Sequence, residues 1–252
     1  MQSVIPATDR SFNYGDGIFT TMQVRDGCIQ LWPLHLQRLQ RSAAQLGFAA
    51  IDWQALQQQA QAAITAPEQV IKLLVSRGEG GRGYAAADVG APGVYIFASP
   101  MPDYRHAQQQ GIRLGIARLQ LAVQPLLAGL KHNNRLEQVL LKQELAGTGH
   151  DDLLVLDQQG FITEVSAANV FLHRDGVWHT PELLRAGVAG VMRQHIMQQA
   201  DITPVNWAVT ELESVDAMFI CNALMGIVPV HSIEGRGLSV RTVQQFSKQV
   251  LC

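Results

Sequence analysis

Lysine is scarce in this sequence, and so is charge of either sign. Four of the 252 residues are lysines, and charged residues make up only 16% of the chain, with a formal net charge of −2. A nearly neutral chain has no electrostatic attraction for nucleic acid or for an anionic membrane, so neither is predicted as a partner and a small-molecule ligand is favoured. Hydrophobic residues make up 47% of the chain, which excludes a disordered protein and indicates a globular one.

Cysteine and histidine are too few and too scattered for cross-links or metal sites. The three cysteines, Cys28, Cys221 and Cys252, show no CxxC spacing, and the eight histidines form no HExxH pattern. Neither a disulfide framework nor a metal site is therefore predicted. The sequence also has no apolar run long enough to cross a bilayer, and residues 1–6 lack the basic and apolar parts of a secretion signal. We therefore expect a cytoplasmic protein.

Hydrophobic periodicity predicts helices and antiparallel hairpins in both halves of the chain. Hairpins are indicated where turn residues at 25–27, 157–160 and 174–176 separate β-prone runs. In the first half, helices are predicted over about residues 33–46, where apolar residues recur every three or four positions, and over about residues 53–64. Two prolines, Pro100 and Pro102, lead into a polar run that predicts a linker over residues 103–111. The fold class expected is α+β, with one mixed α/β domain over residues 1–102 and a second over residues 112–252.

One glycine-rich segment suggests, at first, a nucleotide-binding loop. Gly78 to Gly83 match the GxGxxG pattern directly after a β-prone run. The dinucleotide-binding fingerprint needs a helix that begins at its third glycine, and residues 85–92 are too short for one. The segment is therefore predicted to be a loop that joins two strands, with Arg82 and Tyr84 able to reach a ligand.

Lys131 has the sequence setting that best suits an amine that reacts with a carbonyl group. It follows an apolar stretch over residues 125–129 and precedes a helical pattern that begins near Arg135. An apolar setting disfavours the charged form of a lysine, so its amine is more often free to attack a carbonyl carbon. Lys131 is therefore the candidate for an amine that attacks a carbonyl group.

Several motifs, in chain order, carry a resemblance to one family. They cover residues 12–21, 76–84, 130–139, 163–171, 187–193 and 221–225. The set closely resembles the aminodeoxychorismate lyases, which are fold-type-IV pyridoxal-phosphate enzymes (D-amino-acid aminotransferase-like) related to the branched-chain and D-amino-acid transaminases. Ordered motifs over most of the chain are far more specific than any single one of them.

The resemblance implies a homodimer with pyridoxal 5'-phosphate at the interface between the two domains of each subunit. It implies that Lys131 forms the Schiff base and that Glu164 faces the pyridine nitrogen, where a carboxylate keeps the nitrogen protonated. Arg38 matches the family's phosphate arginine, whose planar guanidinium suits phosphate oxygens. Further cofactor contacts are implied at a helix start and just after a strand, at Val191, Met192, Asn222 and Ala223.

The activity that the resemblance implies is the conversion of 4-amino-4-deoxychorismate to 4-aminobenzoate and pyruvate, a step of folate biosynthesis. In this reaction the side-chain amine of Lys131 removes a proton from the carbon that bears the ring amine of the substrate. The substrate carries two carboxylates, for which Arg82 is the candidate cation, with Tyr84 beside it and Tyr14 in the upstream motif. Thr21 is the candidate for steering the lysine or the substrate.

Two other interpretations remain open from the sequence. A transaminase of the same fold, acting on D-amino or branched-chain amino acids, would use the same Lys131, Arg38 and Glu164 but return an amine to a keto acid. The residues that follow the lysine, 132–138, favour the lyase. A cofactor-binding protein without catalytic activity, or a plain interaction domain, would need no reactive lysine at all.

Overall fold

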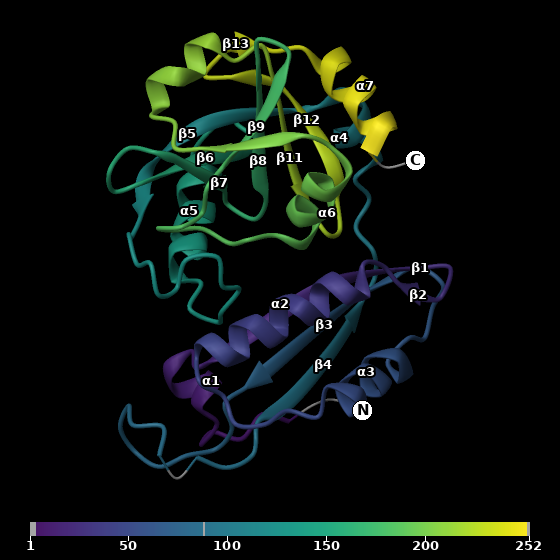
Figure 1. The fold of residues 1–252 in the computed structure, drawn as a ribbon, viewed down its shortest axis with the longest axis vertical. Helices are drawn as coiled ribbons and strands as arrows, with labels where there is room; N and C mark the ends of the chain where they lie inside the picture. Colours follow the sequence, from purple (N-terminus) through teal and green to yellow (C-terminus); the bar gives the residue numbers. More distant parts are fainter. Residues whose placement is uncertain (1–3, 88, 251–252) are drawn as a thin grey trace. The chain divides into compact units, whose positions relative to one another are not determined.

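The chain forms two compact units in the computed structural model, which describes residues 4–87 and 89–250 (Figure 1). The first unit contains the residues up to Pro102 together with Leu130–Arg135, and the second contains Asp103–Gly129 and the residues from Leu136 onward. Each unit has its own sheet and its own hydrophobic core. The predicted fold class, two mixed units of helices and strands, is confirmed.

The first unit is built on a four-stranded antiparallel sheet with short helices and one long one. Its elements are α1 (Arg10–Tyr14), β1 (Gly17–Arg25), β2 (Cys28–Ile29), α2 (Trp32–Gln45), α3 (Trp53–Ala62), β3 (Gln69–Ser76) and β4 (Gly93–Ser99). The strand order is β2-β1-β3-β4, and α2 packs against β1. The predicted hairpin between β1 and β2, both predicted helices and the loop that joins β3 to β4 are all confirmed.

Side chains alternate between the two faces of β1, because successive residues of a strand point in opposite directions. Ile18, Thr20, Met22 and Val24 form the buried row, and Leu39 of α2 lies in the same core. Burying such apolar side chains stabilises the unit by about 1.5–3 kcal/mol each. Thr20 is the polar member of the row, so its hydroxyl needs hydrogen-bond partners inside the core.

The second unit contains a nine-stranded mixed sheet. Its elements are α4 (Arg105–Gln110), β5 (Ile112–Leu121), α5 (Leu136–Ala146), β6 (Asp152–Asp157), β7 (Ile162–Val165), β8 (Asn169–Arg174), β9 (Val177–Pro181), α6 (Val191–Gln199), β10 (Ile202–Val205), the 3-10 helix η1 (Val209–Ser214), β11 (Ala217–Asn222), β12 (Gly226–Ile233), β13 (Arg236–Gly237) and α7 (Val240–Val250). The strand order is β10-β9-β8-β11-β12-β5-β6-β7, with β13 beside β12. The predicted hairpins β6-β7 and β8-β9 are confirmed.

Helices cover the sheet of the second unit where its side chains are apolar. Helix α7 packs against β11 and β12, and α6 also packs against β11. Stacked aromatic rings fill this contact, with Phe171 and Phe219 4.6 Å apart between ring centroids. Helix α5 packs against β5 and β6 around Leu141 and Leu153.

Two features differ from the predicted division of the chain. The predicted linker over 103–111 contains helix α4, whose Gln108 donates from Nε2 to the carbonyl of Met225 (2.8 Å). The lysine segment Leu130–Arg135, predicted as part of the C-terminal domain, belongs to the first unit. In both cases the pairing partner lies far away in the sequence, so local composition could not reveal it.

Among the residues that the structure describes, no helix is long and apolar enough to cross a membrane. The same ranges contain no cluster of three or more histidine, cysteine, aspartate or glutamate side chains with the geometry of a metal site. Of the three cysteines, Cys28 is exposed and Cys221 is buried, both as free thiols. Cys252 lies outside the described residues.

Candidate active site

The segment that carries Lys131 extends the sheet of the first unit. The backbone N–H of Phe19 donates to the carbonyl of Lys131 (2.9 Å), and that of Asn133 donates to the carbonyl of Gly17 (2.9 Å). The segment therefore runs antiparallel to the start of β1, along the edge that β2 leaves open because β2 pairs only with the far end of that strand. Backbone hydrogen bonds on a strand edge hold the lysine at a defined position.

Two glycines before and at the start of β1 make room for this segment. A Cβ atom at Gly17 would lie 2.6 Å from Nδ2 of Asn133, and a Cβ atom at Gly15 would overlap the side chain of Asn134. Asn134 also donates from Nδ2 to the carbonyl of Gly15 (3.1 Å). The upstream glycine motif and the lysine motif, distant in sequence, are thus parts of one structural feature.

Arg135 braces the backbone on both sides of the lysine. Its Nε donates to the carbonyl of His132 (2.8 Å), and its Nη2 donates to the carbonyl of Leu130 (3.2 Å). Burial and the nearby charge of Arg135 lower the pKa of His132 to about 4, so its imidazole is neutral at physiological pH. Arg135 therefore holds the backbone conformation of the segment that carries Lys131.

The amine of Lys131 lies on one face of β1. Its Nζ is 4.6 Å from the ring centroid of Phe19, and the side chain as a whole is half-buried. Thr21 points to the same face as Phe19, because residues two apart in a strand share a face. Thr20 points to the opposite face, into the core under α2.

The side chain of Arg38, a residue of α2, is buried and has few hydrogen-bond partners. Its Nη2 donates to Oγ1 of Thr20 (2.6 Å), and Nδ1 of His35 lies 2.6 Å from the same oxygen. Nε of Arg38 and Nε2 of His35 are both buried and have no hydrogen-bond partner among the described residues. A buried donor without an acceptor is unfavourable, so these atoms indicate a ligand with acceptor oxygens.

The electrostatics of this cluster are dominated by one buried positive charge, that of Arg38. Burial, Arg38 and Lys131 all lower the pKa of His35 far below its ordinary value of 6.5, so the imidazole is neutral. Burial and Arg41 lower the pKa of Arg38 to about 10, which still leaves its guanidinium protonated at neutral pH. A protonated arginine beside a neutral histidine, with no carboxylate paired to it among the described residues, favours an anion.

The glycine-rich loop of the first unit is held by Arg10 rather than by secondary structure. Nη1 of Arg10 donates to the carbonyls of Gly83 and Ala85 (both 3.2 Å), and Nη2 donates to the carbonyl of Tyr84 (2.9 Å). Nε of the same residue forms an ion pair with Asp16 (2.9 Å). The loop therefore has a charged anchor beneath it.

The predicted substrate residues lie on or near this loop. The hydroxyl of Tyr14 accepts a hydrogen bond from the N–H of Gly83 (3.0 Å), and its ring packs edge-on against Tyr84 at 5.5 Å. Tyr84 is 86% exposed, and Arg82 is exposed as well. The structure thus brings Tyr14 and Tyr84 together on the surface.

In the second unit, the side chains of Glu164 and Asn169 form hydrogen bonds with one backbone stretch, residues 187–190. Oε2 of the buried Glu164 accepts from the N–H of Val188 (2.9 Å). Asn169 donates from Nδ2 to the carbonyl of Val188 (2.7 Å) and accepts at Oδ1 from the N–H of Gly190 (3.1 Å). The N–H and the carbonyl of Gly129 also form hydrogen bonds with this stretch. Because these bonds hold the stretch in place, the N–H of Val188 in turn holds the carboxylate of Glu164 in one orientation.

The helix start at Val191 and the turn at Asn222 differ in which polar groups remain available to bind a ligand. Helix α6 begins after Gly190 with no side-chain cap, so its first N–H groups, including those of Val191 and Met192, lack intrahelical partners. The side chain of Asn222 is used within its own turn, where Oδ1 accepts from two backbone N–H groups and Nδ2 donates to the carbonyl of Ala167 (3.1 Å). Only backbone groups at Asn222 and Ala223 are therefore candidates for binding.

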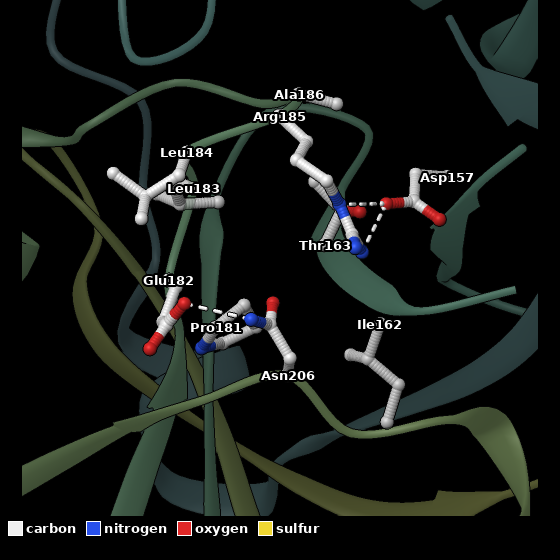
Figure 2. Close-up of a pocket in the computed structure, with 10 residues that line it drawn as sticks. All are labelled: Asp157, Ile162, Thr163, Pro181, Glu182, Leu183, Leu184, Arg185, Ala186 and Asn206. Carbon is white, nitrogen blue, oxygen red and sulfur yellow. Dashed lines mark hydrogen bonds and ion pairs between the residues drawn. The ribbon is translucent and has the colours of Figure 1, made fainter. Parts of the chain in front are cut away.

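A surface pocket of the second unit is lined by other residues (Figure 2). Its polar groups pair with one another: Arg185 with Asp157 (2.6 Å), and Asn206 with Glu182 (2.7 Å). None of the predicted site residues lines it. The lining residues are Asp157, Ile162, Thr163, Pro181, Glu182, Leu183, Leu184, Arg185, Ala186 and Asn206.

Sequence reasoning missed three polar residues, namely Thr20, His35 and Asn169. A threonine in the otherwise apolar row of β1 was a usable signal, because a polar group in a core row needs a partner. His35 lies three residues before Arg38 and so shares its helix face, which was a second signal. Nothing in the local sequence marked Asn169, because its partners come from a separate loop.

Comparison with known proteins gives three relatives of similar length. The chain is 38% identical over 239 residues to the aminodeoxychorismate lyase of Vibrio harveyi, covering 92% of this chain and 88% of that protein. The crystal structure of 4-amino-4-deoxychorismate lyase from Pseudomonas aeruginosa matches with a TM-score of 0.93 and 38% identity, over 99% of this chain and 95% of that one. A hypothetical aminotransferase from Mycobacterium tuberculosis in its PLP-bound form has the same fold, with a TM-score of 0.86 and 23% identity over 99% and 92% of the two chains.

A family match covers most of the sequence. The family described as amino-transferase class IV matches residues 17–233. The matched range includes Lys131, Arg38 and Glu164, the three residues to which the sequence assigned the main cofactor contacts. The chain therefore belongs to the amino-transferase class IV family.

Proposed function

We propose that this protein is a pyridoxal-phosphate-dependent aminodeoxychorismate lyase, which converts 4-amino-4-deoxychorismate to 4-aminobenzoate and pyruvate. The observation that carries the proposal is the 38% identity to the lyase of Vibrio harveyi over most of both chains. The lyase structure from Pseudomonas aeruginosa supports it at the level of the whole fold. The matched chain retains the lysine, the buried arginine and the buried glutamate that such an enzyme needs.

The residues of each unit fit the chemical groups of pyridoxal phosphate. In the first unit, the buried and unpartnered Nε of Arg38 is a donor that suits a phosphate oxygen. Lys131 supplies the amine for the aldehyde. In the second unit, the carboxylate of Glu164 is held by Val188 and suits the protonated pyridine nitrogen, and the N–H groups at the start of α6 suit phosphate.

The chain's own part in the reaction is to hold the reactants and to move one proton. When bound, pyridoxal phosphate supplies an electron sink for the electron pair that is released when a C–H bond breaks. Nζ of Lys131 would take the proton from the substrate carbon that bears the amine. The electron pair would then expel the ether oxygen, so that the C–O bond breaks, enolpyruvate leaves and the ring that remains is aromatic. The enolpyruvate takes up one proton on carbon and so becomes pyruvate.

Recognition of the substrate carboxylates is proposed for the glycine-rich loop. Arg82 is exposed on that loop, and an exposed guanidinium can pair with a carboxylate. Tyr84 and Tyr14 pack against each other beside it. Thr21, on the face of β1 that Lys131 contacts through Phe19, is proposed to steer the lysine or the substrate.

The test is to incubate the purified protein with pyridoxal phosphate and 4-amino-4-deoxychorismate and to measure pyruvate and 4-aminobenzoate. We expect the two products in equal amounts, and no product from the variant Lys131→Ala. Lys142→Ala, which changes a surface lysine paired with Asp152, is the matched control and should retain full activity. No pyruvate from the unchanged protein, together with turnover of D-alanine and 2-oxoglutarate, would show a transaminase instead.

We also infer that the protein is a cytoplasmic homodimer. Three apolar side chains of α5 are exposed, namely Leu136 (71%), Val139 (50%) and Leu140 (45%), and exposed apolar patches of this kind often mark protein contacts. The exposed free thiol of Cys28 suits a reducing compartment. Light scattering on the purified protein and fractionation of cells that express it test the two statements; a monomer or a secreted protein would contradict them.

A further inference from the structure

The buried cluster of Arg38, Thr20 and His35 contains a hydrogen-bond chain that the proposed mechanism does not use. Arg38 has only donors, so its Nη2 must donate to Oγ1 of Thr20 (2.6 Å). Oγ1 lies 2.6 Å from Nδ1 of His35 as well, and all three side chains are at most 8% exposed. The chain of hydrogen bonds therefore runs from Arg38 on α2 to Thr20 on β1 and back to His35 on α2.

The direction of this chain follows from counting hydrogens. The hydroxyl of Thr20 has one hydrogen and, among the described residues, two partners, the arginine and the imidazole. Since the arginine cannot accept, the arrangement that satisfies the hydroxyl is donation to Nδ1 of His35. Nδ1 then carries no proton, and the neutral imidazole has its proton on Nε2. The neutral state agrees with the lowered pKa of His35.

We propose that His35, acting through Thr20, is a positioning residue that orients the guanidinium of Arg38 toward the phosphate group of the cofactor. His35 and Arg38 are three residues apart on α2 and so share one face of that helix, while Thr20 comes from β1. Because the hydroxyl of Thr20 donates its hydrogen bond to the imidazole, the lone pairs of its oxygen face the guanidinium of Arg38.

This orientation has a cost that only a ligand offsets. An arginine loses much rotational freedom when it is held inside a core, and Nε of Arg38 still has no acceptor there. The same fixed geometry becomes an advantage when a phosphate binds, because the guanidinium then does not need to be ordered at that moment. The contribution should therefore appear in the affinity for phosphate-bearing cofactor and not in that for its analogue without phosphate.

The experiment compares binding of pyridoxal phosphate with binding of pyridoxal, which has the same aldehyde but no phosphate. Dissociation constants are measured by absorbance titration for the unchanged protein and for Thr20→Val, Thr20→Ser, His35→Leu and His35→Asn. We expect Thr20→Val and His35→Leu to lose roughly tenfold in affinity for pyridoxal phosphate, as expected for one buried hydrogen bond, and to keep their affinity for pyridoxal. Thr20→Ser and His35→Asn retain polar groups at these positions and should recover most of the loss.

A matched control separates orientation from loss of folding. Met22→Ala changes the next buried residue of the same row of β1 and removes no hydrogen bond, so it should lower the melting temperature of the apoprotein without changing the ratio of the two affinities. An unchanged ratio in Thr20→Val and His35→Leu would overturn the proposal. So would an equal loss for both ligands. If His35→Leu does not fold, Thr20→Val decides, since it preserves the shape of the side chain.

The inference rests on the proposed role of Arg38 in the proposed function, and Arg38→Met distinguishes the two. If this variant loses its preference for pyridoxal phosphate while Thr20→Val and His35→Leu keep theirs, the positioning role fails and the assignment of Arg38 stands. If Arg38→Met keeps the preference, the phosphate assignment itself fails. Neither outcome depends on which substrate the enzyme converts.

Discussion

The first unit contains two buried arginines that are satisfied in opposite ways. Arg10, 4% exposed, forms an ion pair with Asp16 and donates to three loop carbonyls. Arg38, 8% exposed, has the hydroxyl of Thr20 as a hydrogen-bond acceptor and a buried Nε without a partner. Burial alone therefore does not distinguish an arginine that holds the fold from one that is proposed to bind a ligand. The donors that remain without an acceptor do.

This difference has a physical basis in the cost of burying charge. A guanidinium that is removed from water needs acceptors, and a carboxylate is the strongest one that a protein can supply. Where the chain supplies a carboxylate, as Asp16 does for Arg10, the pair is complete without a ligand. Where it supplies only a hydroxyl, as for Arg38, the remaining attraction is available to a phosphate. The predictions below address this contrast, from the largest effect to the smallest.

Replacing Arg38 should separate binding from folding. Arg38→Met removes the cation proposed for the phosphate, and we expect the affinity for pyridoxal phosphate to fall about 100-fold, since charged hydrogen bonds contribute about 1.5–3 kcal/mol each. The stability of the apoprotein should be unchanged or higher, because an apolar side chain replaces a buried charge. Cofactor titration and urea unfolding measure the two quantities. A large loss of stability with normal affinity would reverse the assignment.

Replacing Arg10 should have the converse effect. Arg10→Met leaves the half-buried Asp16 with Arg77 as its remaining charged partner (2.7 Å), so we expect a loss of about 2 kcal/mol in the free energy of unfolding. The affinity for pyridoxal phosphate should change by less than about threefold. The loop should also become accessible to trypsin at Arg82, because its carbonyls lose their anchor. A variant as stable as the parent would argue against a structural role for Arg10.

Acid should lower the stability of the apoprotein through His35, which belongs to the buried cluster of Arg38, Thr20 and His35. The folded pKa of His35 lies far below its ordinary 6.5, so below pH 6.5 the unfolded chain binds a proton that the folded one does not. The free energy of unfolding of the apoprotein should therefore fall as the pH decreases from 6.5, with at most about 1.4 kcal/mol per pH unit from this residue. His35→Asn should show a shallower slope, and Arg10→Met the parental slope. Denaturant unfolding between pH 5 and 7 provides the measurement.

The smallest effect is expected at the edge of the glycine-rich loop. Tyr14→Phe removes the acceptor of the N–H of Gly83 but keeps the ring that packs on Tyr84. Because this loop is exposed, water can replace the hydroxyl, and we expect a loss of at most about 1 kcal/mol in stability. If Tyr14 also contacts the substrate, the KM of the lyase reaction should rise while the affinity for pyridoxal phosphate stays constant. An unchanged KM would limit Tyr14 to a role in the loop.

The position of many elements could be predicted because their causes are local. The turn at residues 25–27, the alternation along β1 and the glycine after α2 each lie within a few residues of the element they define. Helix α4 escaped prediction for the converse reason. Its residues, Arg105–Gln110, are mostly polar and none is buried, so they show no apolar stripe. The contact with Met225 that supports the helix comes from the distant turn between β11 and β12.

The sequence by itself determined the family, and it predicted Lys131 as the reactive lysine and Arg38 as the phosphate arginine, because the ordered motifs around Lys131, Arg38 and Glu164 are chemically specific. Only the tertiary structure decided that the lysine segment joins the edge of β1, and that Arg38 is held by Thr20 and His35 while Arg10 is paired with a carboxylate. The physical reason is that a side chain's partners come from whichever elements fold beside it. A motif specifies a residue's chemistry, and the surrounding acceptors specify how much of that chemistry remains for a ligand.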